Sequence, residues 1–238
     1  MAYPRLLRQL LDAVYPPSCV LCGAPGERGR DLCAGCAAEL PQVGLACDRC
    51  GRPLPATAGV ICGRCLRRPP PYSGVFAPLR YAEPVDRLIA EYKFRGRLTH
   101  AALFAALLIE AAEASGRRPP ELLLPVPLHR SRLRERGYNQ ALELARPLAR
   151  HWGTRLDAFA LRRVRATAAQ MQLPAKQRLK NVRGAFSLRD GVRLPESVAV
   201  VDDVMTTGAT VSEIAKLLRS SGVKRVEVWA VARAGFGS

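Results

Sequence analysis

Strand-like and helix-like patterns alternate along the chain from about residue 72 to its C-terminus. Short apolar runs predict strands at 74–81, 121–128, 159–164, 197–203 and 225–233. Apolar residues at helical spacing predict helices at 83–94, 98–114, 133–152 and 210–222. Strands that alternate with helices usually pair in parallel, so the pattern predicts an α/β fold: a mostly parallel sheet with helices on both faces.

Prolines divide the part of the chain that precedes this domain. Residues 1–17 have the pattern of one short amphipathic helix that ends at two prolines, and residues 67–74 form a proline-rich linker. The predicted division is an N-terminal helix at 1–17, a small module at 18–68 and the α/β domain at 72–238.

No apolar run is long enough for a membrane helix, which needs about 20 residues. The longest is "AALFAALLI", and the N-terminus lacks the apolar core and cleavage site of a secretory signal. We therefore expect a cytoplasmic protein with no membrane insertion.

All eight cysteines lie in the small module, in four C-x-x-C pairs. Each pair can supply two thiolates from one tight turn, and tetrahedral zinc takes four, so the pattern predicts two structural zinc ions. The first and third pairs are 28 residues apart and the second and fourth are 29 apart, which favours one zinc ribbon in each half. The expected ligands are Cys19, Cys22, Cys33 and Cys36 for one zinc and Cys47, Cys50, Cys62 and Cys65 for the other.

Other interpretations of the cysteines remain open. A cross-braced arrangement would use the same eight thiols with different partners. A disulfide framework is disfavoured because no secretory signal points to an oxidising compartment. For the module as a whole, contact with nucleic acid and a scaffold role are both open.

The positive charge of the chain is concentrated in one segment. The net charge is +17, and residues 117–193 contain 18 basic and 5 acidic side chains. This excess favours a polyanionic partner or a phosphate-rich ligand, whereas the preference for arginine over lysine (32 against 5) also fits a compositional bias. Within 162–186 we expect a mobile loop that closes over a ligand or binds single-stranded DNA. Phe186 is its only aromatic residue, so DNA binding there would depend on phosphates, not on base stacking.

The segment "VAVVDDVMTTGAT" carries the main candidate site. Its apolar run predicts a central strand buried on both faces, and it ends in Asp202 and Asp203, at the carboxyl edge where such sheets bind ligands. The turn that follows leads into a helix whose free amides and positive dipole suit a phosphate. Hydroxyl groups and a glycine complete the expected phosphate loop, Thr206, Thr207, Gly208, Ala209 and Thr210. The alternative is simple helix capping, although one cap needs only one such residue.

This segment resembles the phosphoribosyl pyrophosphate (PRPP) motif of type I phosphoribosyltransferases. With "EYKFRG", "PVPLHRSRLRERGYNQA", "QRLKNVRGAF" and the four cysteine pairs, the whole chain resembles the ComF family of competence-associated, phosphoribosyltransferase-like proteins. The resemblance implies a role in DNA uptake, PRPP as ligand with Mg²⁺, and competence proteins as partners. It also implies that Asp202 and Asp203 hold the ribose hydroxyls as the catalytic acids, while the loop holds the 5-phosphate.

The resemblance places a second loop, after the strand at 121–128, at the pyrophosphate of PRPP. Arginine forks suit phosphate oxygens, and one lysine is expected to approach from the side. The residues expected there are Lys93, Leu128, His129, Arg130, Arg132, Arg136, Asn139 and Gln140.

At one position the chain differs from the motif of purine-salvage phosphoribosyltransferases, and this difference narrows the possible acceptor substrates. Purine-salvage members carry an aspartate three positions after the second acid, where this chain has Thr206. A hypoxanthine or guanine acceptor is therefore disfavoured, and no other residue indicates an acceptor. Two hypotheses follow: a transferase of unknown acceptor, or a non-catalytic protein that senses PRPP or nucleotide and binds single-stranded DNA.

Overall fold

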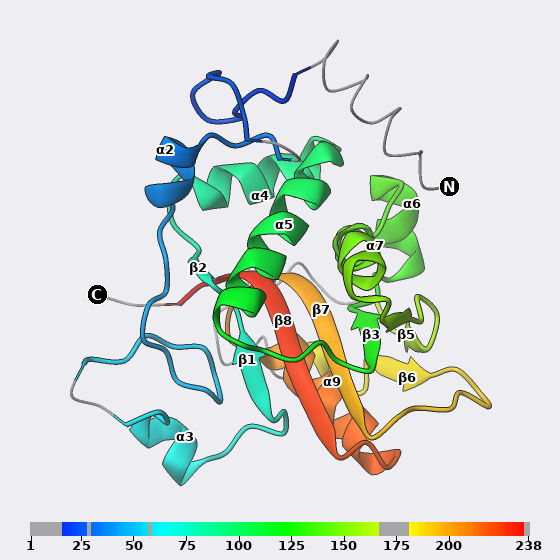
Figure 1. Ribbon diagram of the computed structural model, residues 1–238. Coiled ribbons are helices and arrows are strands. Elements are labelled where there is room, and N and C mark those ends of the chain that lie inside the picture. The colour runs from blue at the N-terminus through cyan, green and yellow to red at the C-terminus, as the bar shows by residue number, and fades with distance from the viewer. Residues whose placement is uncertain (1–15, 28–29, 57–58, 167–180, 236–238) are drawn as a thin grey trace.

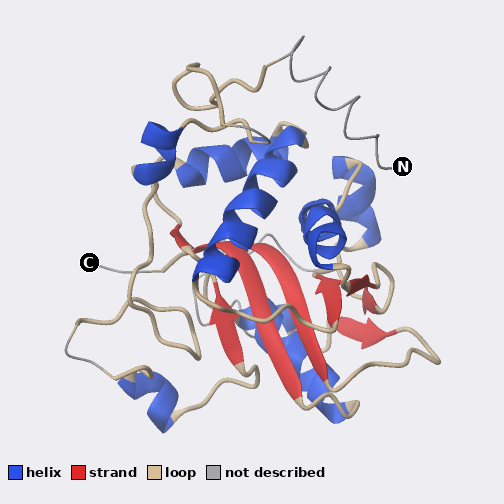
Figure 2. Cartoon of the chain, viewed as in Figure 1, coloured by secondary structure: helices blue, strands red, loops and turns tan. Residues whose placement is uncertain are grey.

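The computed structural model describes residues 16–27, 30–56, 59–166 and 181–235. Figure 2 shows a sheet with helices on both sides and, beside it, an N-terminal part made mostly of loops. The predicted N-terminal helix lies almost entirely outside the described residues, and so does most of the predicted loop within 162–186.

The central sheet is parallel throughout, as predicted. Its strands follow the order β1-β8-β7-β3-β4, and β2 also pairs with β8. The bounds are β1 Gly74–Phe76, β2 Leu79–Arg80, β3 Leu122–Pro125, β4 Arg155–Leu156, β7 Ser197–Met205 and β8 Arg225–Arg233. The predicted strand at 74–81 is thus two short strands, and β4 was not predicted.

Strands β7 and β8 form the middle of the sheet. They pair from Ser197↔Arg225 to Met205↔Arg233, and the four residues Val198 to Val201 have no exposed surface. A run that is apolar on both faces fits only a strand covered by helices on both sides. The prediction of a central strand that leads to the two aspartates is confirmed.

Helices cover the two faces of the sheet, as Figure 1 shows. On one face lie α4 (Val85–Phe94), α5 (Thr99–Ala114) and α7 (Gln140–Trp152), and on the other lies α9 (Ala209–Ser220). Each face has its own cluster of buried apolar side chains.

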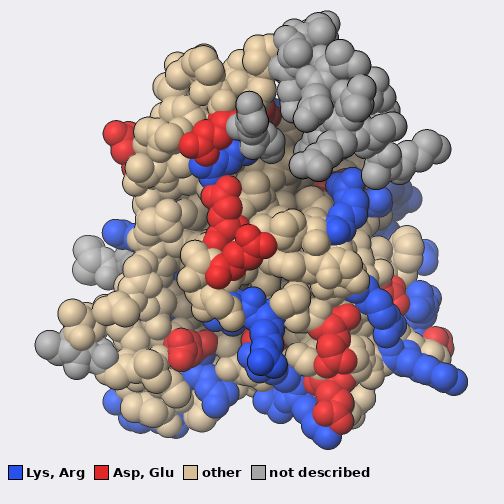
Figure 3. Space-filling view, viewed as in Figure 1, with Lys and Arg blue, Asp and Glu red and all other residues tan. Residues whose placement is uncertain are grey.

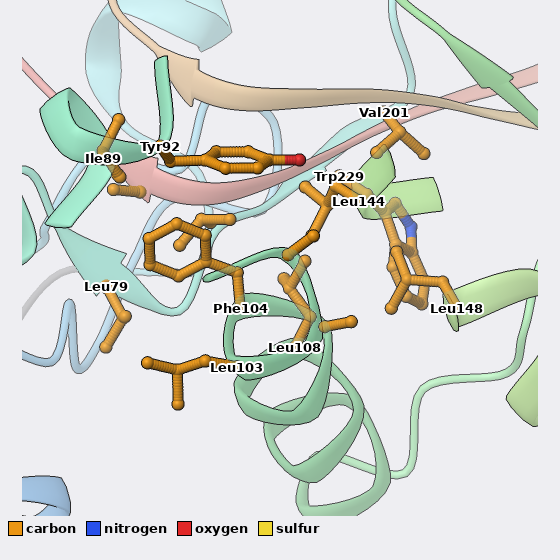
Figure 4. Close-up of a cluster of buried hydrophobic side chains, with 14 of the residues drawn as sticks. Leu79, Ile89, Tyr92, Leu103, Phe104, Leu108, Leu144, Leu148, Val201 and Trp229 are labelled. Carbon is orange, nitrogen blue, oxygen red and sulfur yellow. The ribbon is translucent and has the colours of Figure 1, made fainter. Parts of the chain in front are cut away.

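Aromatic and leucine side chains fill the core between the sheet and α4, α5 and α7. Figure 4 shows Tyr92, Phe104 and Leu108 together with Trp229 of β8. The rings of Tyr92 and Phe104 meet edge to face with centroids 5.6 Å apart, and Trp229 meets the ring of Trp152 at 5.3 Å. Such pairs stabilise the fold beyond their area burial, by about 0.5–1.5 kcal/mol each.

Two predicted elements were wrong in detail. The single helix predicted at 133–152 is broken into α6 (Arg130–Arg136) and α7, because Gly137 adopts a left-handed φ of 81° and the chain turns before α7 begins. The strand predicted at 159–164 exists as β5 (Leu161–Arg163), but it pairs antiparallel with β6 (Phe186–Leu188) in a separate two-stranded sheet.

The two cysteine-rich halves are packed on the α/β domain. The first contains α2 (Ala34–Ala38), and its Leu32 and Leu40 belong to the same buried cluster as residues of α5. The second contains α3 (Gly63–Arg67) and lies against β1, where the Val75 amide donates to the carbonyl of Asp48 at 3.1 Å. The division into parts at 18–68 and 72–238 stays a prediction. Among the described residues, no helix combines the length and the apolar character that crossing a bilayer requires.

Candidate functional site

The loops after β3 and β7 lie side by side at the carboxyl edge of the sheet. Pro125 at the end of β3 is paired with Val201 of β7, and the Val126 amide donates to the Val201 carbonyl at 2.9 Å. The segment with the two aspartates and the segment that starts the second predicted loop are therefore neighbours. The sequence alone did not show how close these two segments lie in space.

Asp203 is the more buried of the two acids, with 2% of its surface exposed. Its Oδ2 lies 2.5 Å from Nζ of Lys93, the penultimate residue of α4. Within the described part of the chain, that oxygen has no hydrogen bond to another group. Asp202 turns its Oδ1 back to accept the amide of Asp203 at 3.0 Å. The structure thus brings Lys93 to the acids, and the ion pair holds a carboxylate that a ligand could share.

Burial shifts the protonation of this cluster. Asp202 keeps some exposed surface, yet its pKa rises to about 6 because burial disfavours the carboxylate, against the opposing charges of Lys93 and Arg163. Burial lowers the pKa of Lys93 to about 8, while the charge of Asp202 opposes this change and Arg136 adds to it. At pH 7 the acid is therefore mostly ionised and the lysine mostly protonated.

The turn from Thr206 to Thr210 leads directly into α9. Gly208 is the N-cap residue and adopts a φ of 78°, a conformation that favours glycine. The Thr207 hydroxyl accepts the Ala209 amide over a long 3.4 Å. Simple capping therefore accounts for only part of the turn, because Gly208 has no side chain that could act as a cap. The amides at a helix N-terminus generally point toward the loop that precedes it.

A cavity of about 180 Å³ lies beside Lys93. Its lining comes from the end of α4 and from α6. Besides Lys93, the residues are Phe94, Gly96, Arg132, Glu135, Arg136 and Tyr138. The Arg136 guanidinium donates to the Gln140 side chain at 2.6 Å, and burial, assisted by the charge of Arg132, lowers its pKa. Three cations and one acid thus line a hollow, and Lys93 links it to Asp203 through their ion pair.

Some predicted site residues have structural partners. Asn139 caps α7 through the Ala141 amide at 3.0 Å and donates to the Val126 carbonyl at 3.1 Å. His129 caps α6 by accepting the Ser131 amide at 3.3 Å. These contacts position the second loop. Leu128 is half-buried in that loop and Arg130 is exposed.

Arg163 of β5 is a member of the site that sequence reasoning missed. Its guanidinium lies over the Phe186 ring, 5.6 Å from the centroid, and its charge opposes the rise in the pKa of Asp202. One arginine in an arginine-rich segment gave no signal of its own, because its place depends on how the small β5–β6 sheet packs.

The cysteines gather into two groups of four, in the sequential arrangement favoured by their spacing. In each group the four sulfurs lie within 4.8 Å of one another, with Cys22–Cys33 at 3.7 Å and Cys50–Cys62 at 3.8 Å. Tetrahedral zinc with Zn–S bonds of about 2.3 Å requires sulfurs about 3.8 Å apart. Both groups therefore fit one structural zinc ion each, and the cross-braced alternative is excluded.

Comparison with known proteins agrees with this arrangement. The family model of the double zinc ribbon domain matches residues 10–66. The chain is 38% identical over 224 residues to DNA utilization protein YhgH of Salmonella typhimurium. The aligned region covers 92% of this chain and 97% of that protein. It is 41% identical over 160 residues to Competence protein F of Haemophilus influenzae, 65% of this chain and 70% of that protein.

The chain belongs to the ComF family. A more distant relative, Competence protein ComFC of Streptococcus pneumoniae, is 28% identical over 153 residues, 64% of this chain and 65% of that protein. The ComF resemblance predicted from the sequence is thereby confirmed, and so is the α/β fold with a double zinc ribbon. PRPP and Mg²⁺ as ligands of this ComF protein stay predictions.

The surface of this ComF protein mixes both signs of charge. In Figure 3 acidic side chains run down the middle of the view, whereas basic side chains gather along its right and lower margins. In the orientation of Figure 1, the right margin holds α6, α7 and the β5–β6 sheet, which belong to the basic segment 117–193. In this view, the basic side chains at the right margin lie on the same side as α6, which lines the cavity.

Proposed function

We propose that this ComF protein binds PRPP with Mg²⁺ at the carboxyl edge of its sheet and acts in the cytoplasm on DNA that enters the cell. The observation that carries the proposal is the pairing of two acids with a phosphate loop at one strand end, with three cations beside them. The names of the relatives, a DNA utilization protein and competence proteins, support the DNA role.

The two ends of the site suit the two ends of ribose 5-phosphate. Amides at the start of α9 and the hydroxyls of Thr206, Thr207 and Thr210 would hold the phosphate. Asp202 and Asp203 would accept hydrogen bonds from the ribose hydroxyls, which resolves the apparent conflict of placing carboxylates beside an anionic ligand. Mg²⁺ that enters with PRPP would neutralise charge on the pyrophosphate.

Lys93, Arg132 and Arg136 suit the pyrophosphate. In a transfer reaction the bond between ribose C1 and the pyrophosphate oxygen breaks, the electron pair leaves with pyrophosphate, and the acceptor forms a new bond to C1. Cations held in a partly buried cavity stabilise charge that develops on the leaving group. Lys93, which pairs with Asp203, would then be shared with a phosphate oxygen.

The second candidate is a non-catalytic protein that senses PRPP and binds single-stranded DNA. Thr206 favours it, because a threonine replaces the acid that acts toward the purine in salvage enzymes and no other base is apparent at the site. The basic segment 117–193 supplies the charge for DNA. Competence proteins are the expected protein partners under both candidates.

Calorimetry with PRPP and Mg²⁺ tests the binding of PRPP at the acids, which both candidate functions require. We expect the double variant Asp202→Asn, Asp203→Asn to lose measurable binding. The matched control is Glu196→Gln. This exposed acid pairs with Lys224 and directly precedes β7, at the end of the strand far from the site. Normal PRPP binding by the double variant would refute the assignment of the site.

Release of pyrophosphate separates the two candidates. A screen of bases and DNA as acceptors should yield pyrophosphate with one of them if the protein is a transferase, and with none if it is a sensor. DNA binding, measured by filter retention, should weaken steeply with salt because it rests on phosphate neutralisation. Retention that is unaffected by salt would contradict the role of the basic segment.

A further inference from the structure

Arg233 joins the second zinc ribbon to the phosphate loop. It is the last residue of β8, with 4% of its surface exposed. Its Nε donates to the carbonyl of Cys50 at 2.9 Å, and its Nη1 donates to the carbonyls of Met205, at 3.0 Å, and Thr206. Cys50 contributes a thiol to the second cluster, Met205 is the last residue of β7, and Thr206 is the first residue of the turn that follows. One guanidinium therefore holds both segments.

The knuckle around Cys50 is in close contact with the sheet. Gly51 adopts a φ of 65°, and a Cβ built there would lie 2.8 Å from Cγ1 of Val75 and 3.6 Å from Cδ of Arg233. A Cβ on Gly74 would lie 2.9 Å from the Asp48 carbonyl. Both glycines are needed for this approach, so the ribbon, β1 and the end of β8 form one packed unit.

The phosphate loop is supported from behind by the same unit. A Cβ on Gly208 would lie 2.8 Å from Cε of Met205 and 3.2 Å from the Tyr72 hydroxyl. Tyr72 belongs to the linker between the ribbon and the domain and is 4% exposed. A shift of the knuckle would therefore reach the loop through Arg233 and would change the packing next to the linker.

The first ribbon has no comparable connection. Its ion pair from Arg30 reaches Glu110 of α5 at 2.6 Å, and its buried leucines face the helices of the core. Within the described chain, none of its hydrogen bonds reaches residues 202–210. Two ribbons that each supply two C-x-x-C pairs thus have different neighbours.

We propose that Arg233 is a positioning residue through which zinc in the second ribbon orders the phosphate loop and sets the affinity of the site for a phosphate monoester. Zinc holds the knuckle around Cys50 in one conformation, the knuckle carbonyl orients the guanidinium, and the guanidinium fixes the carbonyls of Met205 and Thr206. The ligand in this inference rests on the proposed function, whereas the ordering of the loop does not.

A pair of cysteine variants tests the zinc dependence. Cys62→Ser removes a ligand of the second zinc, and Cys33→Ser, the third ligand of the first ribbon, is its matched control. We expect Cys62→Ser to speed amide hydrogen exchange at residues 204–212 at least tenfold and Cys33→Ser to leave this exchange unchanged. Equal effects on the loop from both variants would overturn the inference.

Arg233→Lys tests the connection itself, because it keeps a charge but loses the fork that binds several carbonyls. We expect this variant to retain two zinc ions, to show the fast exchange of Cys62→Ser, and to bind PRPP about tenfold more weakly. Arg225→Lys, at the other and exposed end of β8, is the control. Combining Arg233→Lys with Cys62→Ser should add nothing to the exchange rate.

The outcomes also separate this inference from the proposed function. If the wild-type protein binds no PRPP but loop exchange follows the second zinc, the inference holds and the proposed ligand is wrong. If PRPP binds and both Cys62→Ser and Arg233→Lys behave as wild type, the proposed function stands and the inference is wrong. If Arg233→Lys does not fold, the cysteine pair alone decides.

Discussion

The two zinc ribbons of this protein share a ligand pattern but differ in what they support. The first contributes Leu32 and Leu40, with 0% and 4% exposed, to the main apolar core next to α5. The second has a small cluster of its own around its cysteines and meets the sheet at β1 and Arg233. The first ribbon is therefore part of the core, whereas the second borders the candidate site.

This difference shows that the two copies of a repeated module can have different roles, one in the stability of the domain and one in the order of the site. Burial of leucines contributes to the stability of the whole domain, while hydrogen bonds to a loop carbonyl contribute to local order. Changes in the first ribbon should lower overall stability, and changes in the second should disturb the site more than the fold.

Removal of zinc should have the largest effect. Structural zinc contributes about 10–16 kcal/mol of binding free energy in zinc-finger peptides, so the chelated protein should lose both ribbons and melt at a much lower temperature. Thermal unfolding with metal analysis measures this, and added zinc should restore the transition. Purified protein without zinc and with oxidised thiols would contradict both metal sites.

Leu32→Ala and Ile61→Ala compare the two ribbons directly, because each residue precedes the third cysteine of its ribbon. Leu32 is fully buried in the main core, whereas Ile61 is only partly buried beside the second cluster. We expect Leu32→Ala to cost about 3 kcal/mol and Ile61→Ala about 1 kcal/mol of unfolding free energy. Denaturant titration of both variants measures the difference, and equal losses would remove the distinction between the ribbons.

Gly51→Ala and Gly23→Ala compare the two first knuckles. Both glycines have positive φ, so either alanine should cost about 1 kcal/mol in backbone strain. Only at Gly51 would the new Cβ meet the sheet, 2.8 Å from Val75. Gly51→Ala should therefore also weaken PRPP binding, whereas Gly23→Ala should not. Calorimetry on the two variants separates strain from this contact.

One change should stabilise the protein, in contrast to the losses above, and it lies at the acids near the end of β7. Burial raises the pKa of Asp202 from 3.8 to about 6 in the folded protein, with Lys93, Arg163 and the adjacent Asp203 around it, so its charged form disfavours folding. Asp202→Asn should raise the unfolding free energy by about 1–3 kcal/mol above pH 6, and the gain should disappear below about pH 4, where both states are protonated. Melting curves across this range measure it, with the exposed Asp190→Asn as a control that should show no gain.

Most of the fold follows from local pattern. The strand at 225–233 has the predicted bounds, and the zinc ligands pair as their spacing suggested. The errors occur where one residue breaks a pattern or where distant segments decide. Gly137 divides a helix that the apolar spacing continues across, and β5 leaves the main sheet because its partner is β6, more than twenty residues away.

The candidate site likewise contains residues that a local motif predicts and residues that only the packing of distant segments brings in. Asp202, Asp203 and the loop after them could be read from one short segment, because strand, turn and helix follow one another in the chain. Lys93 was expected to approach the pyrophosphate, which stays a prediction, and its ion pair with Asp203 became visible only in the structure. Arg163 and Arg233 were not predicted as site residues, since neither belongs to a motif.

By itself, the sequence determined the eight cysteine ligands, the central strand and the acids at its end, because each depends on spacing within a few residues, whereas the structure decided which four cysteines form each group. Only the tertiary structure decided which ribbon reaches the phosphate loop. The contact between Cys50 and Arg233 joins residues 183 positions apart, and nothing in either local segment specifies it. Such contacts depend on how whole elements pack, so two ribbons of the same pattern can have different neighbours.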